Sequence, residues 1–203
     1  MQAEVLLFDL GGVLVEWEGV ESLAALSGGR LDVEASRRFW LHSPWVSKHD
    51  VGLCPVEAFA DGVIAELGLA LTREAFLAVY PGWVKDAYPG APALLEQLKG
   101  RYRLATLTNN NAVHFERITR TLDLGRYFDD VFASHEMHMK KPDPAIYREV
   151  TARLGVAPER IAYFDDNIEC VEQGRASGWQ AFHTVGLGAV RAALVELGAL
   201  SAP

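Results

Sequence analysis

Short apolar runs recur along the chain and alternate with segments of helical periodicity. The first run, Val5 to Phe8, stops at Asp9 and is followed by a Gly-Gly pair, as expected of a strand that is buried on both faces. Four similar runs follow at Leu104 to Thr108, Val131 to Ser134, Ile161 to Phe164 and Ala181 to Val185. Five strands separated by helices predict a parallel sheet, and therefore a doubly wound, Rossmann-like α/β core.

The helices between these strands are indicated by their start signals and their apolar faces. Asp143-Pro144 opens a segment in which Ile146, Val150 and Leu154 recur every four residues. This spacing predicts a helix with one face packed on the sheet.

The region from residue 16 to residue 87 has a different pattern. Its apolar positions follow helical spacing, and no strand-like run stands between the first two predicted strands. It also holds enough aromatic residues for a small core of its own, namely Phe39, Trp40, Trp45, Phe59, Phe76 and Trp83. We therefore predict a Rossmann-like core of residues 1–15 and 88–203 and an inserted helical domain of residues 16–87.

Composition places the chain among folded proteins. Half of its 203 residues are hydrophobic, with five Trp, nine Phe and six Tyr, which excludes a mainly disordered chain. The 19 Lys and Arg against 27 Asp and Glu give a formal net charge of −8, and no long basic run is present. We therefore expect no nucleic-acid partner and no anionic membrane surface as a partner.

The cellular setting is predicted from what the sequence lacks. Cys54 and Cys170 do not form a disulfide framework, and the N-terminus has no basic segment before its apolar run. No apolar stretch reaches the roughly 20 residues that a membrane-spanning helix needs. We expect a cytoplasmic protein, and the sequence leaves open whether it is a monomer or a homodimer.

Polar residues gather at the carboxyl ends of the predicted strands, where open parallel sheets bind ligands. They are Asp9, Thr108 with Asn109, Lys141, and Asp165 with Asp166. Together they offer a carboxylate nucleophile, hydroxyl and amide donors, a cation, and an acidic pair that can hold a hard divalent metal. This is the set that phosphoryl transfer requires.

Four motifs carry a resemblance to a known family. They are Phe8-Asp9-Leu10-Gly11-Gly12-Val13-Leu14, Leu107-Thr108-Asn109, Lys141-Pro142-Asp143-Pro144 and Phe164-Asp165-Asp166-Asn167. In this order they resemble the motifs of the haloacid dehalogenase-like (HAD) hydrolase superfamily. The insertion after the first motif stands where the family's helical cap of the dehalogenase and sugar-phosphatase type belongs.

The resemblance implies a role for each matching residue. Asp9 would attack phosphorus to give an aspartyl-phosphate, Thr108 and Lys141 would bind the transferring phosphoryl oxygens, and Asn109 would help to bind and orient the phosphate. The implied enzyme is a Mg²⁺-dependent phosphatase. Its partner would be a small phosphorylated metabolite, such as a sugar phosphate or another phosphate with a good leaving group.

The resemblance also implies the metal ligands. Mg²⁺ would be held by the carboxylate of Asp9, the backbone carbonyl of Gly11 and a carboxylate of the acidic pair. Asp166 is the first choice for that carboxylate, with Asp165 acting directly or through water.

Gly11 departs from the family pattern. Phosphatases of the family usually carry an Asp there, which acts as general acid and base, and a positioned proton-transfer group contributes about 10²–10⁴-fold. One hypothesis is that the substrate has a leaving group that needs little protonation. The other is a substitute proton donor, either His42 or His49 from the cap or His138 from the loop before Lys141.

Two other functions remain as alternatives. Haloacid dehalogenases of the family use the same Asp nucleophile without a metal, but they typically have Tyr where this chain has Gly11, and the pair Asp165-Asp166 would then lack a neutralising cation. A phosphate-binding or interaction protein with weakened catalysis is the second alternative.

Several aromatic residues are open to a structural interpretation. His114, in the helix after Thr108, is expected to be a buried, hydrogen-bonded histidine. Trp17, Trp45 and Trp83 belong either to the core of the cap or to the wall of a substrate pocket, and core is the default.

Overall fold

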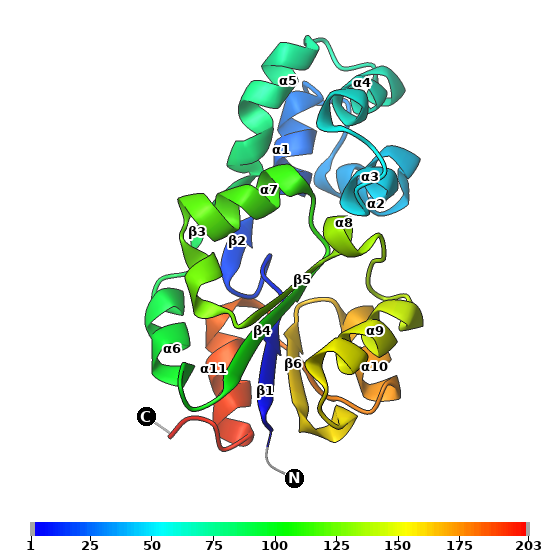
Figure 1. Cartoon of the computed structure of the whole chain (residues 1–203). Coiled ribbons are helices and arrows are strands. Elements are labelled where there is room, and N and C mark those ends of the chain that lie inside the picture. Colours follow the sequence, from blue (N-terminus) through cyan, green and yellow to red (C-terminus); the bar gives the residue numbers. More distant parts are fainter. Residues whose placement is uncertain (1–2, 202–203) are drawn as a thin grey trace.

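The computed structural model describes residues 3–201 and is built on a five-stranded parallel sheet of order β5-β4-β1-β6-β7 (Figure 1). Its strands are β1 (Val5–Phe8), β4 (Arg103–Thr108), β5 (Asp130–Ala133), β6 (Ile161–Asp165) and β7 (Gln180–His183). The predicted α/β class and parallel sheet are confirmed, and each strand begins and ends within two residues of its predicted bounds.

Both faces of the sheet are buried. In β1, Leu6 and Phe8 pack into one hydrophobic cluster, whereas Val5 and Leu7 pack into the cluster on the other face. Helices α6 (Ala91–Leu98) and α11 (Gly186–Glu196) cover the first face. Helices α9 (Pro144–Leu154) and α10 (Ile168–Ala176) cover the second (Figure 1). Two buried faces explain why the strand reads as a continuous apolar run rather than an alternating one.

The helices between β2 (Val15–Trp17) and β3 (Val84–Ala87) lie beyond the carboxyl ends of the main strands (Figure 1). They are α1 (Gly19–Leu26), α2 (Val33–His42), α3 (Pro44–Asp50), α4 (Val56–Leu67) and α5 (Arg73–Val79), followed by the 3₁₀ turn η1 (Tyr80–Trp83). A separate hydrophobic cluster holds them together, with Phe59, Phe76, Tyr80 and Trp83 among its buried members. The aromatic side chains of this region therefore form a core of their own.

A two-stranded antiparallel sheet joins this helical region to the main sheet. It consists of β2 (Val15–Trp17) and β3 (Val84–Ala87), with Val15 opposite Ala87 and Trp17 opposite Val84. The expectation that residues 16–87 contain no strand-like segment is wrong. Strands of three and four residues that include Glu16, Lys85 and Asp86 are too short and too polar to give an apolar run.

The remaining elements are short and connect the main strands. They are α7 (Ala112–Glu116), η2 (Arg117–Thr121), η3 (Leu124–Tyr127), α8 (Ser134–Met137) and η4 (Pro158–Arg160). Among residues 3–201, every helix falls short of the length and apolar character that crossing a bilayer would require.

Candidate active site

The strand ends bring predicted site residues into contact. Asp9 follows β1, Thr108 ends β4 and Asp165 ends β6, and all three are buried. Lys141 reaches the same point from the loop between α8 and α9. Its Nζ donates to Oδ1 of Asp9 at 2.9 Å and to Oδ2 of Asp165 at 2.6 Å. Residues that are far apart in the sequence thus meet through the parallel order of the sheet.

Lys141 is a buried cation held by three acceptors. Besides the two carboxylates, its Nζ donates to the carbonyl oxygen of Leu107 at 2.9 Å. Burial alone would lower the pKa of Lys141, but the carboxylates of Asp165 and Asp9 outweigh this and raise the pKa well above its ordinary value. The ammonium therefore stays charged and can attract an anion.

Asp165 has its carboxylate oxygens occupied within the protein. Oδ2 accepts from Lys141 Nζ and from the hydroxyl of Tyr163, and Oδ1 accepts from the backbone N–H of Asn167 at 2.7 Å. Asp165 therefore orients Lys141. The neighbouring Asp166 is only partly buried and is left to face the pocket.

The site concentrates negative charge. Ligand oxygens of Asp9, Asp165 and Asp166 lie within 4.8 Å of one another. Burial raises the pKa of Asp9 to about 7, with Lys141 opposing and the two other carboxylates adding to the rise. Burial, and then Asp165, also raises the pKa of Asp166. Three ionised carboxylates against one ammonium leave a charge of −2, and an oxygen-ligated divalent cation fits this donor set.

Glycine is required next to this cluster. A Cβ on Gly12 would lie 2.3 Å from Oδ2 of Asp166, and Gly12 has a φ of +73°. By contrast, a Cβ on Gly11 would meet only Trp17 Cβ, at 3.7 Å, and Gly11 has no positive φ. The close approach of the backbone to Asp166 explains Gly12, whereas the space at Gly11 would admit a side chain.

Asn109 fixes the loop that carries Lys141. Its Oδ1 accepts from the backbone N–H of Lys141 at 2.8 Å, and its Nδ2 donates to the backbone carbonyl of Lys141 at 2.9 Å. The side chain thus binds both the backbone N–H and the backbone carbonyl of Lys141. This arrangement orients Lys141 and leaves one amide N–H of Asn109 for a ligand.

A pocket of about 570 Å³ lies between the strand ends and the helical region. Six of the predicted site residues line it: Asp9, Gly11, Thr108, Asn109, Lys141 and Asp166. Asp165 lies behind them, in contact with Lys141. The opposite wall includes Trp17, Trp40, His42 and Asp50. The pocket therefore combines the charged cluster with aromatic surface.

The three candidate proton donors occupy different places. His42 is exposed and lines the pocket. His49 is buried, its Nδ1 lies 2.9 Å from the carbonyl oxygen of Cys54, and burial lowers its pKa. His138 is exposed, with Nδ1 2.9 Å from the carbonyl oxygen of Val51. Neither His49 nor His138 is among the residues that line this pocket.

The other aromatic residues separate into core and pocket. His114 is buried, and its Nε2 lies 2.9 Å from the carbonyl oxygen of Tyr80, as expected of a hydrogen-bonded structural histidine, and it also forms part of the pocket lining. Trp83 is buried and Trp45 is partly buried in the core of the helical region. Trp17 lines the pocket.

Two residues at the site were missed in the sequence. Tyr163 stands two positions before Asp165 in a strand, so period-two alternation places both side chains on one face and could have identified it. Asp50 ends α3 and lines the pocket from the helical region. No motif or spacing marks Asp50, because only the tertiary structure brings it to the pocket.

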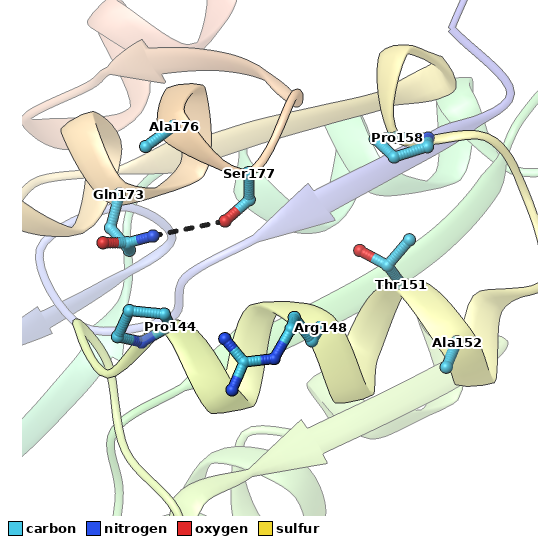
Figure 2. A pocket seen from close by; sticks show the side chains of 8 residues that line it. All are labelled: Pro144, Arg148, Thr151, Ala152, Pro158, Gln173, Ala176 and Ser177. Carbon is cyan, nitrogen blue, oxygen red and sulfur yellow. Dashed lines mark hydrogen bonds between the residues drawn. The ribbon is translucent and has the colours of Figure 1, made fainter.

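A second hollow, between α9 and α10, lacks this chemistry (Figure 2). Arg148 is the one charged residue that lines it, and Gln173 Nε2 donates to Ser177 Oγ at 3.3 Å across its edge. Its lining includes Pro158, which directly precedes β6. The hollow therefore extends toward the amino ends of the strands, away from the carboxyl ends where Asp9 and Asp165 lie. The pocket at Asp9 is therefore the candidate active site.

The four motifs and their convergence agree with a comparison against protein families. A family model described as haloacid dehalogenase-like hydrolase matches residues 3–178. The chain belongs to this family. Residues 3–178 include every member of the carboxylate and lysine cluster, so the HAD motifs and the pocket fall inside the matched region.

Individual HAD relatives match over shorter segments. A phosphorylated carbohydrates phosphatase of Thermotoga maritima is 35% identical over 98 residues, which are 48% of this chain and 45% of that protein. An (S)-2-haloacid dehalogenase 4A of Burkholderia cepacia is 34% identical over 83 residues, 40% of this chain and 36% of that protein. The match thus covers less than half the length of either relative.

A solved structure agrees in fold over most of the chain. A HAD family enzyme from Bacteroides thetaiotaomicron, in complex with magnesium and inorganic phosphate, has a TM-score of 0.74 and 24% identity. The alignment covers 90% of this chain and 94% of that chain. The two proteins therefore share their fold over most of both chains.

Proposed function

We propose that this HAD protein is a Mg²⁺-dependent phosphatase that hydrolyses a small phosphomonoester through an aspartyl-phosphate on Asp9. The observation that carries the proposal is the position of the Asp9 carboxylate. It lines the pocket, lies 2.9 Å from Lys141 Nζ, and shares a cluster with Asp165 and Asp166. Such a nucleophile beside fixed positive charge suits phosphoryl transfer, which depends on positioning and charge stabilisation.

The chain's own residues provide most of this chemistry. An oxygen of Asp9 attacks phosphorus in line while the bond to the leaving oxygen breaks, and water later hydrolyses the aspartyl-phosphate. Lys141 and the hydroxyl of Thr108 stabilise the charge on the equatorial phosphoryl oxygens. Asn109 keeps the backbone of Lys141 in place through its two hydrogen bonds.

The metal ligands follow from the same contacts. Asp9 and Asp166 would bind Mg²⁺ together with the backbone carbonyl of Gly11. Asp165 would act through water, since its oxygens already accept hydrogen bonds from the protein. When bound there, Mg²⁺ would supply positive charge to offset these carboxylates and the phosphoryl oxygens. The magnesium and phosphate named for the Bacteroides thetaiotaomicron enzyme support this assignment.

A phosphorylated carbohydrate is the proposed substrate class. The Thermotoga maritima relative carries that activity in its name, and the pocket wall includes Trp17 and Trp40, whose faces suit a sugar ring. A volume of about 570 Å³ suits a small metabolite. The proposed setting is the cytoplasm.

Dehalogenation is the competing activity, since a haloacid dehalogenase is among the relatives. A 2-haloacid brings a carboxylate of its own. Without a metal it would enter a site where the carboxyl groups of Asp9, Asp165 and Asp166 share one ammonium, and like charges in a buried site are costly. The third carboxylate therefore favours a phosphomonoester with Mg²⁺.

The test is hydrolysis of 4-nitrophenyl phosphate, with 2-chloropropionate as the competing substrate. We expect phosphate release that needs Mg²⁺, stops with EDTA and is abolished in Asp9→Asn. Asp61→Asn, which changes an exposed carboxylate of α4 away from the pocket, should retain activity. Chloride release that persists in EDTA would establish the dehalogenase. Binding of Mg²⁺ and phosphate without turnover would establish a binding protein.

A further inference from the structure

The turn after α3 presents one carboxyl group to the candidate active site. Asp50 is the last residue of α3 and lines the same pocket as Asp9 and Gly11. It comes from the helical region, whereas the carboxylates of Asp9, Asp165 and Asp166 come from the strand ends. The pocket therefore has an acidic group on each side.

The core holds this turn in place through the segment around α8, which lies beside α3 (Figure 1). Ser134 Oγ donates to the backbone carbonyl of Asp50 at 2.5 Å. The ring of His138 bonds to the carbonyl of Val51 through Nδ1 at 2.9 Å. Gly52 has a φ of +71°, and a Cβ there would lie 2.3 Å from the carbonyl oxygen of His135. Such a docked turn holds the Cα of Asp50 at a fixed place in the pocket wall.

The carboxyl group of Asp50 has no hydrogen-bond partner among residues 3–201. Its backbone carbonyl, by contrast, accepts from Ser134 Oγ. Burial raises the pKa of Asp50 to about 7, and Lys140 opposes this rise. A carboxyl with its ordinary pKa would be ionised at neutral pH, whereas this one can donate a proton and then accept one.

Several other charged or titratable groups surround Asp50. The negative charge of Asp50 adds to the rise that burial causes in the pKa of Tyr80 of η1. Lys140 lies in the segment after α8 and acts on Asp50 in turn. Further groups on the elements next to the turn are Arg37 and His42 of α2, Lys48 and His49 of α3, and His135 and His138 at α8. Lys140 is the cation that acts on the Asp50 carboxyl, and its own Nζ donates to Ser47 Oγ at 2.9 Å.

In-line displacement determines where a proton donor must stand. The leaving oxygen departs from the face of phosphorus opposite the attacking oxygen of Asp9. The strand ends lie on the Asp9 side, so the leaving oxygen points to the wall formed by the helical region. Two carboxylic residues of that wall line the pocket, the exposed Glu21 and the half-buried Asp50. Asp50 is the one on the turn that is fixed to the core.

We propose that Asp50 is the general acid and base of the phosphatase reaction and replaces the carboxyl group that is absent at Gly11. The inference rests on the proposed function. In the first step, the O–P bond to Asp9 forms, the P–O bond to the leaving group breaks, and protonated Asp50 gives its proton to the leaving oxygen. In the second, ionised Asp50 takes a proton from the attacking water, whose oxygen forms a bond to phosphorus while the bond between phosphorus and the Asp9 oxygen breaks. Asp9 is released as a carboxylate and the phosphoryl group leaves as inorganic phosphate.

The test compares leaving groups in Asp50→Asn. Asn has nearly the same shape, so the variant should fold, which a thermal unfolding curve checks. The quantity measured is kcat/KM, because it reports the steps up to release of the alcohol. We expect kcat/KM to fall about 10²–10³-fold for an alkyl phosphate such as glucose 6-phosphate, and less than about fivefold for 4-nitrophenyl phosphate, whose leaving group needs no proton. A purely structural role would lower both by the same factor.

Three controls separate this inference from the proposed function. Asp61→Asn should leave both values unchanged, and Asp9→Asn should abolish both. If His42→Asn, rather than Asp50→Asn, lowers kcat/KM selectively for the alkyl phosphate, the assignment to Asp50 is wrong, and the proposed phosphatase function still stands. An equal loss on both substrates, or no loss, in Asp50→Asn also overturns it. If the wild-type protein hydrolyses neither ester, both proposals fail.

Discussion

Gly12 and Asp166 are packed so closely that a single methyl group would not fit between them. A Cβ on Gly12 would lie 2.3 Å from the carboxylate oxygen Oδ2 of Asp166. Asp166 is therefore placed by the backbone of the turn after β1. This contact joins two motifs that are distant in the sequence at the acidic cluster.

Gly12→Ala should therefore damage both the fold and the site. The left-handed φ of +73° and the contact with Asp166 together predict a loss of about 2 kcal/mol in the free energy of unfolding. Magnesium affinity should fall as well, because Asp166 must move. Urea unfolding and Mg²⁺ titration measure the two effects. In the matched control Gly188→Ala, the new Cβ has no neighbour within 4 Å, so stability should stay equal or rise. Equal effects of the two substitutions would contradict the argument.

Gly11→Asp should be tolerated and should increase turnover of poor leaving groups. The only neighbour of a Cβ at Gly11 is Trp17 Cβ, at an ordinary contact distance of 3.7 Å, and the residue lines the pocket. We expect kcat/KM for an alkyl phosphate to rise about 10-fold in the wild-type background. The rise should be larger in Asp50→Asn, where the new carboxyl supplies the missing proton. Steady-state kinetics on both backgrounds test this, and the same small change in each would mean that the two carboxyl groups do not substitute for one another.

Lys141→Met should cost stability as well as activity. Removing the ammonium leaves Asp9 and Asp165 buried without their shared cation, which predicts a loss of about 3 kcal/mol in unfolding free energy. The measurement is chemical denaturation in EDTA, so that no divalent metal compensates. Lys99→Met is the matched control because its exposed Nζ donates to the carbonyl oxygen of Arg126 rather than to a carboxylate. A loss as large in the control would show that the buried ion pair is not the cause.

His114 should make stability depend on pH in the acidic range. Burial lowers its pKa from 6.5 to about 4. Between these values the unfolded chain binds more protons than the folded one, so stability is full above pH 6.5 and declines as the pH falls toward 4. The decline attributable to this group is about 3 kcal/mol. His114→Gln should remove that part of the pH slope in unfolding curves, and a slope that stays the same in this variant would contradict the assignment to His114.

The sheet could be predicted because its physics is local. Val5–Phe8 lies between two helical layers, so all four of its side chains are apolar and the strand can be recognised from this short run alone. The site residues at or directly after the carboxyl ends of β1, β4 and β6 could be predicted as well, since a parallel sheet places these ends on one side. Asp9, Thr108 and Asp165 could thus be grouped without knowledge of their distances.

Other features arise only from tertiary contacts. The β2–β3 pair has short strands with mixed polarity, and its pairing joins residues about 70 positions apart, which no local pattern reveals. Asp50 stands in a cap turn, and its exposure to the pocket depends on how Ser134 and Gly52 dock that turn on the core. The bonds between Asn109 and the Lys141 backbone belong to the same class, because they connect two loops.

The pairing of β2 with β3 has an evolutionary consequence. The helical region leaves and re-enters the core through two strands that lie side by side, so its two ends are neighbours whatever stands between them. An insertion anchored in this way can be lengthened, shortened or exchanged without rerouting the parallel sheet. The acidic cluster and Lys141 would stay where they are, while a new set of helices brings a new pocket wall. The β2–β3 junction thus allows the substrate-binding wall to change in evolution while the catalytic cluster at the strand ends is kept.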